Sequence, residues 1–160
     1  MSDPGDYPTE EVVTAVLTAS RVLVAVSARS LAEVEDRLTL AQFRVLVVLE
    51  NRRRLNLNGL ADALDVTPST ALRTIDRLVA SGLAQRQENA ANRREVVLSA
   101  TDEGARVVRD VTGRRSAEIA EILAGMSARK RSELISAFKS FSAAANEPAP
   151  HPRDLAVLGW

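Results

Sequence analysis

The sequence has no cysteine and only one histidine among its 160 residues. Without cysteine, the chain can form no disulfide, no thiolate metal site and no thiol redox switch. The histidine, His151, lies in a proline-flanked segment, where we expect a solvated side chain, not a general base or a metal ligand. The sequence also lacks a glycine-rich phosphate loop and a nucleophile elbow. We therefore predict a protein that is not an enzyme and that holds no metal or cofactor.

The chain also lacks net charge and a long uninterrupted hydrophobic run. It has 21 basic and 21 acidic residues, and 46% hydrophobic with 26% charged residues is ordinary for a globular domain. Residues 1–8 are acidic and polar, unlike a secretory signal. Residues 12–28 are apolar-rich but interrupted by threonine, serine and arginine, whereas a membrane span needs ~20 largely apolar residues. We expect a cytoplasmic protein that does not enter a membrane.

The most informative segment is a helix expected between Thr67 and Gly82. The Thr67 side chain can cap the helix, Pro68 suits its first position, and Gly82 can adopt the positive φ of a helix end. At 100° per residue, one face is apolar and is expected to be buried. It consists of Ala71, Leu72, Ile75, Leu78 and Val79.

The opposite face of this helix carries hydroxyl and guanidinium groups. Arginine pairs with guanine edges or phosphates, and serine or threonine suits either, so the face can bind DNA. An ordinary solvated face is the alternative interpretation. The residues of this polar face are Ser69, Thr70, Arg73, Thr74 and Arg77.

The flanking segments favour DNA binding. Residues 58–64 predict a short helix with Leu60, Ala61 and Leu64 on one face, and the following turn is short. After the polar helix, residues 83–88 and 95–100 predict two strands joined by the loop 89–93. This order is typical of a winged helix-turn-helix.

Positive charge is concentrated in this unit although the whole chain is neutral. Residues 72–94 contain five arginines and two acids, a net charge of +3. Such segregation is typical of a surface that binds nucleic acid. The residues are Arg73, Arg77, Arg86, Arg93 and Arg94 against Asp76 and Glu88.

Residues 40–50 predict a helix that supports this unit from inside. Three arginines follow it, at positions 52–54, and they either complement the negative helix end or contact phosphate. Ala41, Val45, Val48 and Leu49 are expected to face inward, with Phe43 and Leu46 at the sides.

The segment from Thr9 to about Ser30 predicts a long helix, because a cap and two acids begin it. A helix this apolar must be covered on most sides. In a chain of this length the expected cover is the last helices and a second subunit. Its apolar stripe is Val12, Val16, Ala19, Leu23 and Val26.

Two later helices complete the expected dimerisation region. One begins at Thr101 and runs to about Leu123, and the other follows a cap at Ser127. The buried stripe of the second is Leu134, Ile135, Phe138 and Phe141.

These segments predict a single domain, 1–160, that is mainly α with a small β-hairpin wing. The winged helix-turn-helix lobe spans about 38–101, and N- and C-terminal dimerisation helices span about 9–36 and 102–145. For the tail, 146–160, docking on the dimer and fraying both stay open.

The motifs resemble the MarR (multiple-antibiotic-resistance regulator) family of bacterial transcription factors, in detail over residues 38–104. Residues 57–64 look like its leucine-x-x-leucine-alanine helix, and 66–83 like its recognition helix and exit. The wing is the most specific match. The family usually has Asp-Arg-Arg, five residues, then Leu-Thr-x-x-Gly; here Asn92-Arg93-Arg94 precedes, by five residues, Ala100-Thr101-Asp102-Glu103-Gly104.

Two positions depart from the family pattern. Asn92 replaces the acid that pairs with an arginine in relatives, and Asp65 stands where glycine is usual in the turn. Asparagine can still accept a hydrogen bond, and aspartate tolerates a left-handed backbone, so both changes are compatible with the fold.

The resemblance implies a homodimer that binds double-stranded DNA at a pseudo-palindromic operator with half-sites ~10 bp apart. It implies a repressor, released by a small aromatic or lipophilic effector between the lobe and the dimerisation region. The expected DNA-binding residues are Ser69, Thr70, Arg73, Thr74 and Arg77 of the recognition helix and Asn92, Arg93 and Arg94 of the wing.

Two other functions remain open from the sequence. One is a winged helix that binds an acidic protein without binding DNA. The other is an enzyme or ligand carrier built on a helical dimer, which would show turnover or tight small-molecule binding without DNA affinity.

Overall fold

The computed structural model describes residues 9–52, 54–89 and 92–146, and it leaves undescribed the side chains of 92–95. The tail from residue 147 onward, with His151, lies outside this description. The elements, in chain order, are α1 (Thr9–Ala32), α2 (Leu40–Arg52), α3 (Leu57–Leu64), α4 (Pro68–Ala80), β1 (Ala84–Asn89), β2 (Asn92–Ala100), α5 (Asp102–Ala124) and α6 (Ala128–Ala144).

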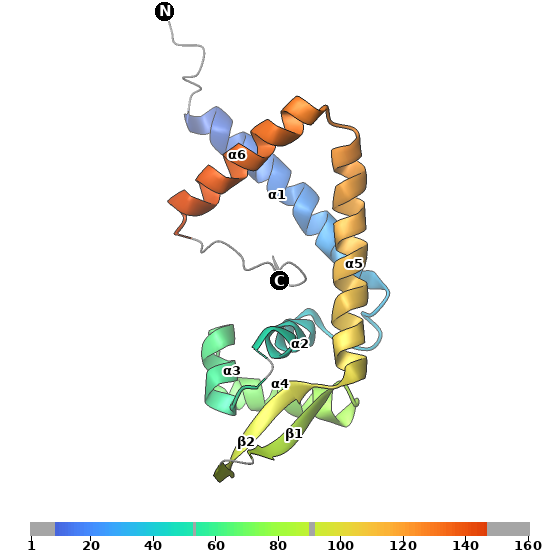
Figure 1. Cartoon of the computed structure of the whole chain (residues 1–160), viewed down its shortest axis with the longest axis vertical. Helices are drawn as coiled ribbons and strands as arrows, with labels where there is room; N and C mark the ends of the chain where they lie inside the picture. The colour runs from blue at the N-terminus through green and yellow to red at the C-terminus, as the bar shows by residue number, and fades with distance from the viewer. Residues whose placement is uncertain (1–8, 53, 90–91, 147–160) are drawn as a thin grey trace, which may run out of the picture.

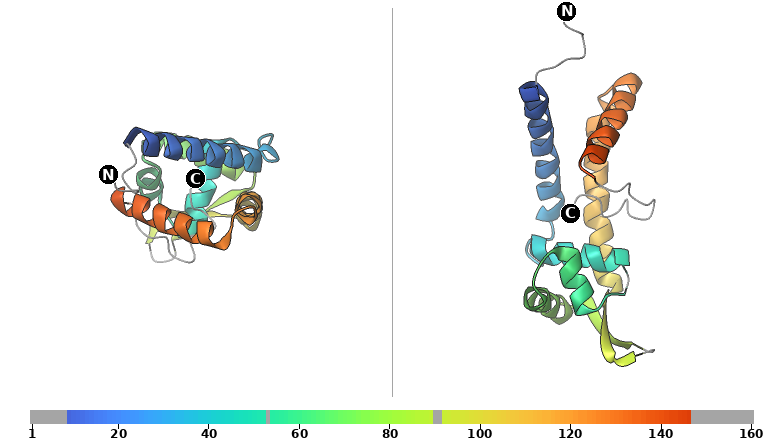
Figure 2. Two further views of the ribbon diagram at one scale, coloured as in Figure 1. Left: turned by 90° about the horizontal axis from the view of Figure 1, so that it is seen from above. Right: turned by 90° about the vertical axis from the view of Figure 1, so that its left-hand side faces the viewer.

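The elements form a lobe at one end and a long helical extension at the other (Figure 1). Helices α2, α3 and α4 pack together with the hairpin of β1 and β2 in the lobe. Helices α1 and α5 lead away from the lobe, and α6 returns from the far end of α5. Figure 2 shows α1 and α6 running along opposite sides of this extension.

The core of the lobe is apolar and closely packed. Side chains from α2, α3 and α4 and the side chain of Leu83 are almost completely inaccessible to solvent. Their burial supplies the main driving force for folding. The most deeply buried large side chains of the lobe are Phe43, Val45, Leu46, Leu49, Leu60, Ile75, Leu78 and Leu83.

The inward face of α2 is wider than its sequence predicted. Phe43 and Leu46, which we expected at the sides, are fully buried, whereas Ala41 is exposed and Val48 is only half-buried. The reason is that α2 contacts α3, α4, α5 and β2, so neighbours cover several of its sides. On α4, Leu72 was expected to be buried but is 41% exposed, because it lies outside the stripe that packs into the lobe.

Local capping explains where α3 and α4 begin and end. Thr67 accepts a hydrogen bond from the backbone N–H of Thr70 at 3.3 Å, and Pro68 is the first residue of α4, as predicted. Asp65 adopts φ 53°, so aspartate indeed tolerates the left-handed turn between the two helices. Gly82 has φ +74° beyond the end of α4, which confirms its predicted conformation.

The second strand of the hairpin is longer than predicted. The strands pair antiparallel from Ala84 with Ala100 to Asn89 with Asn92, and the register shifts between Glu88 and Asn89. The predicted loop 89–93 was therefore too long, since β2 already begins at Asn92. Strand pairing overrides the weak strand propensity of asparagine and arginine here.

The base of the hairpin is anchored to the start of α5. The backbone N–H of Thr101 donates to the Leu83 carbonyl at 3.0 Å, and its hydroxyl donates to the Gly82 carbonyl at 2.8 Å. The same hydroxyl caps α5 through Gly104, as predicted. A Cβ atom on Gly104 would lie 2.0 Å from the Leu83 carbonyl oxygen, so this close approach requires glycine.

Most of the apolar surface of α1 and α6 is exposed in the single chain. Only Val26, Ser30 and Leu31 of α1 are buried, and α6 has no buried residue. Val24 is 68% exposed and Ile135 is 57% exposed. Among the described residues, α6 therefore does not bury α1 over most of its length, and the expected cover by a second subunit stays a prediction.

Helix α1 contacts α5, and polar pairs near the C-terminal end of α1 contribute to this contact. Arg29 pairs with Glu118, and Arg114 donates to Glu33 at 3.0 Å and to the Ser30 carbonyl at 3.4 Å. The hydrogen bond to Glu118 raises the pKa of Arg29 further above its ordinary value, so this guanidinium stays charged.

By length and composition, α1 is the one helix among the described residues that could cross a membrane. Our prediction that its polar residues exclude a span was therefore too strong. Core helices of soluble proteins and signal sequences share this length and composition.

Candidate nucleic-acid interface

The polar face of α4 is accessible. Ser69, Thr70, Arg73 and Arg77 are exposed, and Thr74 is half-buried. Within the described part of the chain, Arg73 and Arg77 make no ion pair, so their guanidinium groups are available to a ligand. These two cations and the neighbouring hydroxyls can bind phosphates or base edges.

Three hydroxyl groups gather at the first turn of α4. The Thr67 oxygen lies 3.1 Å from the Ser69 hydroxyl and 3.0 Å from the Thr70 hydroxyl. Thr74 donates its hydroxyl hydrogen to the Thr70 carbonyl at 3.0 Å, so its oxygen is left to accept. The positive end of the helix dipole coincides with this cluster and favours a phosphate.

A shallow hollow of about 200 Å³ separates this face from the start of α2. Residues of both helices line it, and two of them, Thr39 and Gln42, were not among the predicted site residues. The Thr39 N–H donates to the Gln42 side chain at 2.6 Å, and the Gln42 N–H donates to the Thr39 hydroxyl at 3.3 Å. This reciprocal pair is a capping box. Its Thr-x-x-Gln spacing before an apolar run was a signal in the sequence that could have identified the position.

The arginine Arg86 is not free, although the sequence placed it among the positive charges of this unit. Its guanidinium on β1 pairs with the Asp76 carboxylate on α4. The two charges neutralise each other, so Arg86 adds no free positive charge beside the polar face of α4.

The three predicted wing residues lie at the tip of the hairpin. Asn92 begins β2 and pairs with Asn89, while the side chains of Asn92, Arg93 and Arg94 lie outside the described residues. The hairpin and α4 occupy the same end of the molecule, away from α1 and α6 (Figure 1). The fold therefore brings the two predicted parts of the site to one end.

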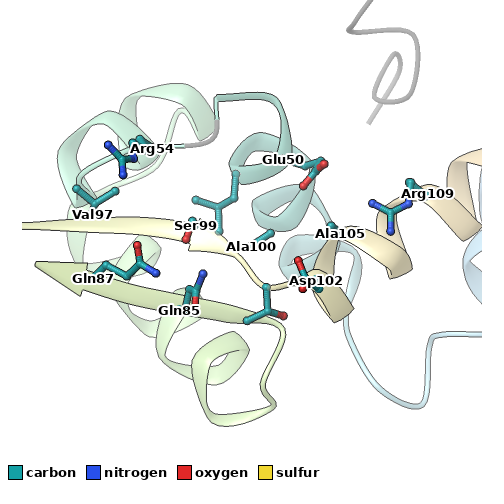
Figure 3. A pocket seen from close by; sticks show the side chains of 12 residues that line it. Glu50, Arg54, Gln85, Gln87, Val97, Ser99, Ala100, Asp102, Ala105 and Arg109 are labelled. Atoms are coloured by element: carbon teal, nitrogen blue, oxygen red, sulfur yellow. The ribbon is translucent and has the colours of Figure 1, made fainter. Parts of the chain in front are cut away.

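A second hollow, of about 530 Å³, opens between the end of α2, the hairpin and the start of α5 (Figure 3). Polar and charged side chains dominate its rim, and apolar groups such as Leu49 and Val97 form only part of its wall. The ionisable residues that line it are Glu50, Arg54, Asp102 and Arg109. Such a lining suits a polar or charged molecule better than a lipophilic one.

No group of three or more His, Cys, Asp or Glu residues that could hold a metal ion occurs among the residues that the structure describes. Residues 33–36 contain three acids, and one of them, Glu33, pairs with Arg114.

Comparison with known sequences matches the lobe to a family of regulators. The model of the MarR family matches residues 38–96. The HTH-type transcriptional repressor MdtR of Bacillus subtilis (strain 168) is 35% identical over 85 residues. This match covers 53% of the present chain and 55% of the repressor, so the chain spans about half the length of this curated relative.

Comparison with solved structures extends the likeness beyond the lobe. The crystal structure of RV1404 from Mycobacterium tuberculosis has 40% sequence identity and a TM-score of 0.84, covering 89% of this chain and 98% of that one. Wild-type MarR from E. coli, in its apo form, is 21% identical with a TM-score of 0.62, covering 85% and 98%. At this lower identity the likeness is one of fold alone.

Proposed function

The chain belongs to the MarR family, and from this premise we propose that it is a transcriptional regulator that binds double-stranded DNA in a sequence-specific way. The observation that carries the proposal is the exposed face of α4, where Arg73 and Arg77 are unpaired beside a cluster of hydroxyls. This face lies at the same end of the molecule as the hairpin.

We propose that α4 enters the major groove. Ser69, Thr70 and Arg73 lie toward its N-terminal half and are placed to reach base edges, as in other recognition helices. Thr74 and Arg77 follow on the same face, next to the hollow at the start of α2, where a phosphate can sit.

The wing supplies the second contact in this proposal. Arg93 and Arg94 would enter the flanking minor groove or bind its phosphates, since a narrow A·T tract attracts arginine. Asn92 begins the strand that carries them and would contact the same flank.

The regulator is proposed to act as a homodimer. The exposed apolar side chains of α1 and α6 need a cover that the described part of the chain does not provide. Pairing two chains through the segments 9–36 and 102–145 would place two lobes, 38–101, on the half-sites of a pseudo-palindromic operator ~10 bp apart.

Repression and release by an effector complete the proposal. The relative MdtR is named a repressor, and occupation of a promoter by a dimer suffices to block transcription. The 530 Å³ hollow joins the lobe to the start of α5, so a small molecule bound there could favour one lobe arrangement over another. Its lining favours a polar effector over the lipophilic class that the family resemblance implies. A cytoplasmic location follows from this function.

Selection of bound fragments from random duplexes at physiological salt tests the proposal. We expect a palindromic motif with half-sites about one helical turn apart. Enrichment without any motif, or no enrichment at all, would contradict sequence-specific binding. If the chain instead captures an acidic protein and binds no duplex, the result would favour a winged helix that binds protein and not DNA.

A further inference from the structure

The pair of Asp76 and Arg86 connects the recognition helix to the wing. Asp76 lies at the edge of the polar face of α4, and Arg86 lies on β1, ten residues later in the chain. Their side chains are 49% and 38% exposed, so the pair lies at the surface between the two elements.

The opposite edge of the hairpin is tied at the same level. Arg86 faces Leu98 across the two strands, and Leu98 in turn pairs with Leu55, just before α3. Two backbone hydrogen bonds form this bridge: Leu55 N–H to the Leu98 carbonyl at 3.3 Å, and Leu98 N–H to the Leu55 carbonyl at 2.7 Å. One rung of the hairpin is therefore held from both sides.

Beyond this rung, the strands continue towards the tip of the hairpin. Gln87 pairs with Val97 and Glu88 with Val96, after which the register shifts towards the tip. Gln87, Glu88 and Val96 are exposed. The rung of Arg86 and Leu98 is thus a point at which the lobe holds the direction of the wing.

We propose that the Asp76–Arg86 pair is a clamp that sets the angle between the recognition helix and the wing. This inference rests on the proposed function, since it concerns how far the wing tip reaches into the neighbouring groove. Arg86 is then a positioning residue and not a DNA contact. The ion pair with Arg86 then explains why an acid, Asp76, lies on a surface that binds an anionic ligand.

The clamp makes a prediction opposite to that of simple electrostatics. Loss of an acid from a DNA-binding surface should tighten binding, because it removes repulsion from phosphates. If the clamp operates, Asp76→Asn weakens binding instead, by about three- to tenfold, because the wing loses its direction. Glu88→Gln is the matched control: it removes one exposed negative charge from the same strand as Arg86, and it should leave affinity unchanged or raise it.

The experiment measures affinity for two duplexes, the full operator found by selection and a version without the flanks that the wing reaches. We expect Asp76→Asn and Arg86→Gln each to weaken binding to the full operator, and the double variant to be no weaker than either single variant. On the shortened duplex all variants should match the unmodified protein. Reversal of the pair, Asp76→Arg with Arg86→Asp, should restore part of the loss.

Equal or tighter binding of Asp76→Asn to the full operator would overturn the clamp. If Arg86→Gln weakens operator binding, Asp76→Asn tightens it and the double variant shows the sum of the two effects, Arg86 contacts DNA directly.

A readout without DNA separates the clamp from the proposed function. Amide hydrogen exchange over residues 84–89 and 96–100 should become faster in Asp76→Asn than in Glu88→Gln. The reason is that the ion pair to α4 is made by Arg86 and not by Glu88. If the unmodified protein binds no duplex, the proposed function fails, and the exchange rates still decide whether the pair holds the wing. Unchanged exchange in Asp76→Asn would refute the clamp.

Discussion

Gly104 is the residue whose size the fold restricts most directly. Its Cα lies against the carbonyl of Leu83, and a methyl group there would meet backbone atoms that cannot move without breaking the link from hairpin to α5. We predict that Gly104→Ala lowers the free energy of unfolding by more than about 2 kcal/mol. Urea denaturation at fixed protein concentration measures this change.

Gly113→Ala is the control, on the same helix. Apart from its chain neighbours and the backbone of its own helix turn, no described heavy atom lies within 4 Å of the added methyl group, so alanine should stabilise α5 by up to about 1 kcal/mol. Equal stability of the two variants would mean that the close approach at Gly104 does not constrain the fold.

Arg73 is the residue on which base recognition is expected to depend most. We predict that Arg73→Ala weakens operator binding by about 1–3 kcal/mol and relaxes specificity at one base pair. Fluorescence anisotropy with the operator and its single-base variants measures both effects. Arg131→Ala removes an exposed arginine from α6, which lies at the end of the molecule opposite the lobe, and should change neither affinity nor specificity.

Arg94 is predicted to act at the wing tip. A base-edge contact would make Arg94→Ala weaken binding by about 1–3 kcal/mol, whereas a phosphate contact would lower affinity uniformly and make the salt dependence shallower. An unchanged affinity and salt slope would remove Arg94 from the mechanism.

At the scale of elements, the first turn of α4 combines stability with recognition. Thr67 caps the helix and also touches the hydroxyls of Ser69 and Thr70. We predict that Thr67→Ala destabilises the protein by about 1 kcal/mol, because an N-cap is lost. Ser69→Ala keeps the cap and should preserve stability while it weakens DNA binding. Thermal unfolding and anisotropy together distinguish the two roles.

At the scale of the whole molecule, the feature to explain is the exposed apolar surface of α1 and α6. Their exposed apolar side chains include Phe138, which is 46% exposed, and a stable dimer needs to bury well over ~1,000 Å². We predict that the protein is a dimer at micromolar concentration and that Phe138→Glu shifts it towards monomer with loss of operator binding. Sedimentation velocity tests this.

Lys139→Glu is the control for this experiment. It introduces a glutamate at the next, exposed position of α6, outside the apolar stripe of that helix, so it adds an acid without removing an apolar side chain. A monomeric unmodified protein, or a Phe138→Glu variant that remains dimeric, would contradict the proposed pairing.

The sequence alone determined the features that depend on residues close to one another in the chain. The Thr67 cap, the left-handed turn at Asp65 and the positive φ of Gly82 were predicted because capping and turn conformations act within a few residues. The spacing of the wing motif was enough to indicate the family for the same reason, since hairpin length and the cap of α5 are local.

Only the tertiary structure decided the features that join distant segments. Arg86 counted as a free positive charge until the fold placed it against Asp76, and the start of α2 joined the interface because the chain folds it beside α4. The predicted buried side of α2 was right for Val45 and Leu49 but wrong for Ala41, and it placed Phe43 and Leu46 only at the sides. The reason is that several elements cover that helix at once. Such contacts depend on which surfaces meet in space, and a helical period or a charge count contains no information about that.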